Sequence, residues 1–178
     1  MSIAVLQDKI RARKTPLALV LSPEADKLNP KITKNFTDLY GPGDMAEAEA
    51  LRYHGSQLIG QAAPLLPAVV LRAERYLRCG FMGMDVLANL VNMAKTQGLY
   101  TIVDARTSAP EVYTAGGIHA DGVTVTPYPG SDVCRAAEDK SVFAAVRTGN
   151  PSAPEIQSLM SGDRRLYLAC LLYTSDAA

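Results

Sequence analysis

Asp104 and Arg106 are the most direct candidates for a catalytic or ligand-binding role. They follow the apolar run 100–103, so a carboxylate and a guanidinium would stand at the end of one strand. The guanidinium could hold an anion there, because its planar fork matches carboxylate and phosphate groups. The same two residues could equally form an ordinary ion pair.

Further polar residues stand where other predicted strands end. In parallel α/β folds the carboxyl ends of the strands carry the binding sites. A turn alone could also explain residues 148–151, because all four are turn-forming types. The candidate ligand-binding residues at these ends are Ser22, Thr126, Thr148 and Asn150.

Metal and thiol chemistry are not indicated by the sequence. Cys79, Cys134 and Cys170 lie far apart and form no C-x-x-C pair, which argues against zinc and fits a reducing cytoplasm. His54 and His119 have no cysteine or carboxylate paired with them, so we interpret both as structural.

The composition is that of an ordinary globular protein, with 48% hydrophobic and 20% charged residues. Lys plus Arg equals Asp plus Glu at 18 each, so no overall charge favours nucleic acid or an acidic membrane surface. An apolar run long enough to span a membrane and a basic, apolar leader are both absent from the sequence. We therefore expect a cytoplasmic protein.

Strand and helix patterns alternate along the chain, which predicts an α/β fold with a parallel sheet. Residues 29–44 are expected to form a loop with at most one helical turn, since two prolines and two glycines interrupt them. Asp44 is predicted to cap the following helix, with Glu47 completing a capping box. The predicted strands are 17–21, 67–71, 100–103, 120–126 and 142–147. The predicted helices are 3–14, 45–62, 81–98, 153–160 and 164–173.

Five of these segments resemble the bacterial branch of the orotidine 5′-phosphate decarboxylase family. Residues 66–72 (LPAVVLR) are similar to the family's P-A-V-K-P-Q strand, and residues 80–84 (GFMGM) to its G-x-x-G-M. Residues 98–106 (GLYTIVDAR) resemble G-L-x-V-I-x-D-A-K. Residues 121–130 (DGVTVTPYPG) resemble D-A-V-T-V-N-P-Y-x-G, and residues 147–151 with Gln157 resemble T-S-N-P…Q.

The resemblance implies a partial (β/α)8 TIM barrel with about five of the eight parallel strands. We expect one incomplete barrel domain over residues 1–169 and a non-native tail over residues 170–178. The family's phosphate-holding segments P-G-x-G and S-S-R-G are not found in the sequence. The resemblance also implies a homodimer, a pyrimidine nucleotide as ligand, and no metal or other cofactor.

By the same resemblance, the reaction is the decarboxylation of orotidine 5′-monophosphate to UMP in pyrimidine biosynthesis, by a carbon–carbon lyase. The family's Lys-Asp-Lys-Asp array falls on Val70, Asp104, Arg106 and Ala109. Arg106 would donate a proton to carbon poorly, because a guanidinium stays protonated in proteins. Weak turnover is therefore expected. The alternative is a non-catalytic paralogue, a pseudoenzyme that acts as a nucleotide-binding or interaction subunit.

In the family pattern the remaining candidates contact the nucleotide. Ser22 falls on the aspartate of the family's G-L-D-P strand, which contacts the ribose, and Thr126 falls on the asparagine of N-P-Y. Thr148 and Asn150 lie in the polar turn.

Overall fold

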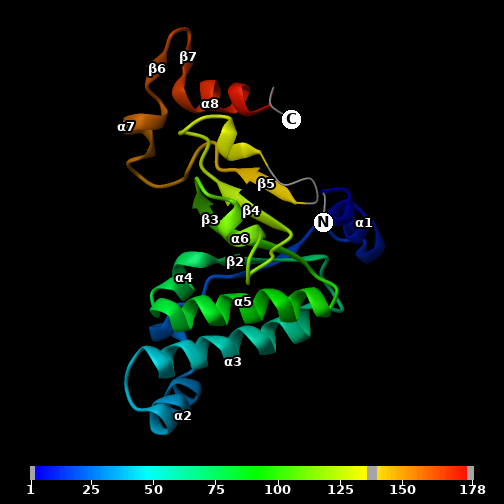
Figure 1. Ribbon diagram of the computed structural model, residues 1–178, viewed down its shortest axis with the longest axis vertical. Coiled ribbons are helices and arrows are strands. Elements are labelled where there is room, and N and C mark those ends of the chain that lie inside the picture. Colours follow the sequence, from blue (N-terminus) through cyan, green and yellow to red (C-terminus); the bar gives the residue numbers. More distant parts are fainter. Residues whose placement is uncertain (1–2, 136–139, 176–178) are drawn as a thin grey trace.

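A computed structural model describes residues 3–135 and 140–175 of the chain. Its centre is a five-stranded parallel sheet in the order β1-β2-β3-β4-β5, drawn in Figure 1. The predicted α/β fold with a parallel sheet is thereby confirmed. The strands are β1 (Ala18–Leu21), β2 (Ala68–Arg72), β3 (Tyr100–Thr107), β4 (Gly122–Val125) and β5 (Ser141–Ala144).

Helices occupy the connections between these strands and both ends of the chain. A short antiparallel hairpin, β6 (Met160–Ser161) and β7 (Arg164–Arg165), precedes the last helix. The helices are α1 (Ile3–Arg13), α2 (Pro30–Tyr40), α3 (Asp44–Ala62), α4 (Ala73–Leu77), α5 (Gly80–Thr96), α6 (Glu111–Thr114), α7 (Ala153–Gln157) and α8 (Leu166–Ser175), and the 3-10 turns are η1 (Ala25–Lys27) and η2 (Asp132–Cys134).

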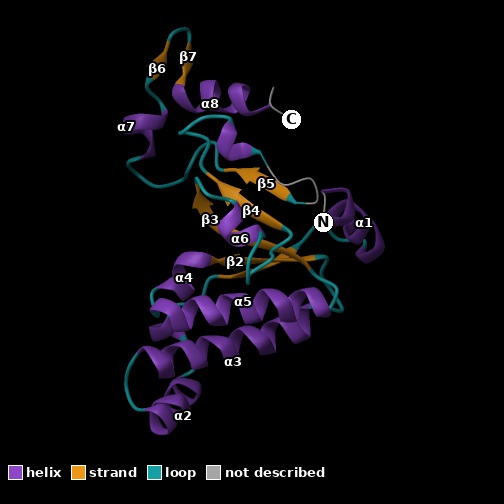
Figure 2. Cartoon of the chain, viewed as in Figure 1, coloured by secondary structure: helices purple, strands orange, loops and turns teal. Residues whose placement is uncertain are grey.

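The main core lies between the sheet and the pair α3 and α5, which run side by side on one face of it (Figure 2). Val69, Leu71 and Val103 point into this core and are completely buried. Successive strand residues point to opposite faces, so their neighbours face the concave side. Tyr100 and Ile102 lie there in a smaller cluster, against which Leu6 of α1 packs.

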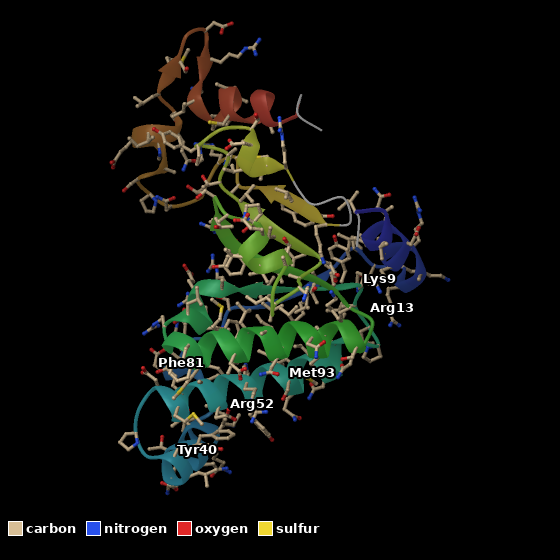
Figure 3. All side chains as sticks on the ribbon, viewed as in Figure 1. Lys9, Arg13, Tyr40, Arg52, Phe81 and Met93 are labelled. Carbon is tan, nitrogen blue, oxygen red and sulfur yellow. The ribbon has the colours of Figure 1, made fainter. Side chains whose placement is uncertain are left out.

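The basic side chains of α1 hold the amino-terminal helix against the rest of the molecule. The ammonium of Lys9 donates to the carbonyl of Gly98 at 2.6 Å, and the guanidinium of Arg13 donates to the carbonyls of Ala63 and Pro64. These carbonyls follow the carboxyl ends of α3 and α5, where cations are favoured. Figure 3 labels both side chains beside those helix ends.

Two local predictions are wrong. Residues 30–40 form the helix α2, because Pro30 occupies its first turn, where no amide donor is needed, and the Asn29 side chain accepts from the Lys31 amide at 3.0 Å. Asp44 is the first residue of α3 and not its N-cap, which is Gly43, and no side-chain capping bond forms.

The helices α4 and α6 and the β6–β7 hairpin were not predicted from the sequence. The helix α8 runs through the predicted tail boundary at residue 170, and residues 176–178 of that tail lie outside the described residues. Among the described residues, no helix has the length and apolar character needed to cross a membrane.

The close approach of α4 to α5 depends on Gly83, and we expect Gly83→Ala to destabilise the protein by about 2–4 kcal/mol. A Cβ at this position would lie 1.7 Å from the carbonyl oxygen of Tyr76, so the helices would have to move apart. The matched control is Gly60→Ala in α3, where a Cβ meets nothing within 4 Å. This control should stabilise by about 0.5–1 kcal/mol, because alanine restricts the unfolded chain. Urea unfolding of the variants measures both changes, and equal effects would contradict the packing described.

Candidate functional site

The carboxyl ends of β2, β3 and β4 bring a cluster of charged and hydroxyl groups together. Arg72 ends β2, and its Cα is paired in register with that of Asp104 on β3. Because Leu71 and Val103 point to the helices, Arg72 and Asp104 point to the concave face. Parallel pairing thus places a guanidinium beside a carboxylate that lies 32 residues away in sequence.

Asp104 is contacted by two arginines, one at each carboxylate oxygen. The Nε of Arg72 donates to Oδ2 at 3.4 Å, and the Nε of Arg106 lies 3.6 Å from Oδ1. The Asp104 side chain is only 18% exposed, whereas those of Arg72 and Arg106 are 33% and 50% exposed. The carboxylate is therefore held in place, and the two guanidinium groups remain partly open to solvent and to a ligand.

Thr124 of β4 organises the end of β3. Its hydroxyl donates to Oδ1 of Asp104 at 2.7 Å, and its oxygen accepts the backbone amides of Ala105 and Arg106 at 3.0 and 2.9 Å. The pairing of β3 with β4 shifts register between Val103 and Thr107, and Arg106 has a φ of 46°. A non-glycine residue with this φ is strained, and bulges of this kind redirect side chains near sites. Thr124 stabilises both the bulge and the carboxylate.

A cavity of about 360 Å³ opens next to Arg106, at the ends of β4 and β5. Arg106, Thr126 and Thr148 line it, so the structure brings three of the predicted site residues together. Tyr128 and Tyr167 add aromatic surface, and α8 supplies part of the wall. The mixture of apolar wall, hydroxyl groups and one cation is typical of small-molecule sites.

The polar turn after β5 is braced by Gln157. The amide of Thr148 donates to Oε1 of Gln157 at 2.9 Å, and Nε2 of Gln157 donates to Oγ of Thr148 at 2.6 Å. The Thr148 hydroxyl donates in turn to Oδ1 of Asn150 at 2.6 Å. Asn150 is exposed and does not line the cavity, so in this structure it supports Thr148.

Ser22 lies apart from this group. Its hydroxyl accepts from the Nε of Arg75 at 3.3 Å, and it lines a separate cavity of about 150 Å³ with His54 and Tyr76. Val70 and Ala109, on which the family resemblance places a lysine and an aspartate, have no charged partner in the contacts described next. Val70 packs against the small cluster of the concave face, and the amide of Ala109 donates to the hydroxyl of Thr107 at 2.9 Å.

Arg72 and Thr124 were missed when the sequence was read for site residues. Arg72 could have been found from the alternation of side chains between the two faces of β2, since this alternation places Ala68, Val70 and Arg72 on one face. Thr124 could be found only from the strand opposite Asp104. In residues 3–135 and 140–175, no group of three or more His, Cys, Asp and Glu residues could hold a metal ion.

Neither a family model nor a curated protein matches the sequence. Solved structures match the fold over nearly the whole chain. The Leishmania donovani OMP decarboxylase is 24% identical with a TM-score of 0.72, over 95% of this chain and 63% of its own. The Plasmodium berghei orotidine 5′-monophosphate decarboxylase is 15% identical with a TM-score of 0.77, over 97% of this chain and 70% of its own.

The chain has the fold of the orotidine 5′-phosphate decarboxylases. Its five parallel strands are those of a partial TIM barrel, as predicted from the sequence. The Leishmania donovani UMP synthase matches with 24% identity and a TM-score of 0.72, over 94% of this chain and 35% of its own. The chain thus spans less than two thirds of the length of the two Leishmania proteins.

We expect Thr124→Val to lower the unfolding free energy by about 2 kcal/mol or more. Valine has nearly the same shape but leaves two backbone amides and one carboxylate oxygen without the hydroxyl, and each of these part-buried or exposed hydrogen bonds contributes about 0.5–1.5 kcal/mol. Thr126→Val, next to the end of the same strand, is the control and should change stability by less than about 0.5 kcal/mol. Thermal unfolding of both variants measures the difference. An unchanged Thr124→Val variant would show that the bulge does not depend on this hydroxyl.

Proposed function

We propose that this chain is a member of the orotidine 5′-phosphate decarboxylase family that binds a pyrimidine nucleotide and decarboxylates it slowly. The observation that carries the proposal is the pair of arginines around Asp104. No contact joins a lysine to this carboxylate among the described residues. The site thus combines a carboxylate with two cations, and both cations are guanidinium groups.

The low turnover follows from the chemistry of arginine. Decarboxylation leaves negative charge on carbon, which must receive a proton as CO₂ departs. A guanidinium stabilises that charge, but it is a poor proton donor because it holds its proton tightly. Losing one group that stabilises a transition state typically lowers the rate by about 10²–10³. Val70 and Ala109 remove two further charges from the array that the resemblance implies.

Nucleotide binding is supported by the cavity beside Arg106. The hydroxyl groups of Thr126 and Thr148 can donate to or accept from a base or a ribose, and the guanidinium of Arg106 can bind an anion. Tyr128 offers a ring on which a base can stack. Ser22 and Asn150 would act only after a rearrangement, because both lie outside this cavity.

The second candidate function is a non-catalytic subunit. In the homodimer that the resemblance implies, Ala109 has no carboxylate to offer to a partner's site. A chain of this kind would bind a nucleotide or a second copy without completing the reaction in either site. We include no cofactor or metal in either proposal, and the boundary at residue 170 stays a prediction.

The proposal is tested by calorimetric binding of UMP together with the ultraviolet assay for decarboxylation of orotidine 5′-monophosphate. UMP should bind saturably, and Arg106→Gln should weaken the binding about tenfold or more, since a charged hydrogen bond contributes about 1.5–3 kcal/mol. Arg78→Gln is the control, because Arg78 is exposed and lines a different cavity. Arg106→Lys should raise the decarboxylation rate above that of the unmodified chain.

Two results would contradict the proposal. Rapid decarboxylation by the unmodified chain, or growth of a uracil-requiring strain that depends on it, would contradict slow turnover. Absence of saturable UMP binding would contradict the nucleotide site.

A further inference from the structure

Arg72 lies where the family resemblance implies no cation. The resemblance places a lysine at Val70 and a glutamine at Arg72, and this chain has an apolar residue at the first position and a cation at the second. The two positions share the concave face of β2, because they are two residues apart. Compared with the family pattern, the cation of this strand thus lies two residues closer to the carboxyl end of β2.

At its new position Arg72 reaches the same carboxylate that Arg106 contacts. Its Nε lies 3.4 Å from Oδ2 of Asp104. The Nε of Arg106, in the bulge of β3, approaches the other oxygen, Oδ1. Both contacts use Nε, and the terminal nitrogens of each guanidinium carry its remaining N–H donors. A planar anion can accept from such donors in pairs.

The net charge of Asp104 and the two arginines that contact it is positive, which favours binding of an anion. Arg72 and Arg106 bring two positive charges, and Asp104 brings one negative charge. Glu74 also approaches the Nε of Arg72, at 3.6 Å, but its side chain is 67% exposed and its charge is therefore well screened by water. Without Arg72, the negative charge of Asp104 would balance the positive charge of Arg106, and no net positive charge would remain to attract the carboxylate of a ligand.

We propose that Arg72 is a ligand-binding residue that, with Arg106, selects a pyrimidine bearing a carboxylate over one that lacks it. The choice of a pyrimidine as ligand rests on the proposed function, whereas the selection for a carboxylate rests on the two arginines. Arg106 also lines the cavity at the ends of β4 and β5. The carboxylate of the ligand would thus lie toward Arg72 and the rest of the molecule toward that cavity.

The test compares two pairs of probes that differ only in the carboxylate: orotidine 5′-monophosphate against UMP, and orotate against uracil. The unmodified chain should bind the first member of each pair more tightly. Arg72→Gln, which installs the residue of the family pattern, should weaken the carboxylate-bearing probes about tenfold or more and leave UMP and uracil within about twofold. Arg78→Gln should change none of the four affinities.

A second variant separates binding from a merely structural role. Arg72→Lys keeps the charge and the ion pair with Asp104, so it should fold, and it should show a reduced preference because an ammonium lacks the planar fork. An unchanged preference in Arg72→Lys, or an equal loss for all four probes in Arg72→Gln, would overturn the inference.

The two proposals fail in different ways. If neither nucleotide binds but orotate binds more tightly than uracil in an Arg72-dependent manner, the proposed nucleotide site is wrong and the role of Arg72 stands. If both nucleotides bind equally in the unmodified chain and in Arg72→Gln, the role of Arg72 is wrong and the nucleotide site stands. Absence of binding by all four probes overturns both.

Discussion

The in-register parallel pairing of β2, β3 and β4 is the constraint on which the strand-end site depends. Val69, Leu71 and Val103 are completely buried against α3 and α5, and that burial decides which face of each strand points to the helices. Arg72 and Asp104 are then forced to the concave face, opposite each other. A slip of one residue would turn both into the helical layer, where a charge is costly to bury. The apolar core therefore selects the polar contacts of the site.

The bulge in β3 at Arg106 completes the arrangement of charged side chains that the regular strand pairing begins. A positive φ at a non-glycine residue costs about 1–2 kcal/mol, so the bulge at Arg106 needs compensation. Thr124 supplies it with two accepted amide bonds, and its own donated bond orients Asp104. Because one hydroxyl makes all three bonds, the direction of Arg106 and the direction of Asp104 are coupled. The site is thus positioned by β4 as much as by β3.

The alternation of short apolar runs with helical patterns allowed a parallel sheet to be predicted, and the family resemblance added the partial barrel. The sequence was less informative where one residue type is compatible with two different local structures. Pro30 interrupts a helix in the interior but begins one in the first turn, and the second use applies here. Arg72 was not predicted as a site residue, because the family resemblance places the cation of this strand at Val70. Thr124 and the bulge depend on a partner strand about 20 residues away, which no local pattern specifies.

In the proposed function, an arginine stands where the family resemblance places a lysine, and this change would separate two properties: attraction of an anionic ligand and delivery of a proton to carbon. Attraction of an anionic ligand requires only a fixed positive charge, and a guanidinium provides it with better geometry for a planar carboxylate. Proton delivery to carbon requires a cation that can become neutral at ordinary pH, and a guanidinium cannot. Both cations that contact Asp104 are arginines, so these contacts offer positive charge to an anion but no group that readily gives up a proton. A site of this composition is better suited to holding a carboxylate than to removing it.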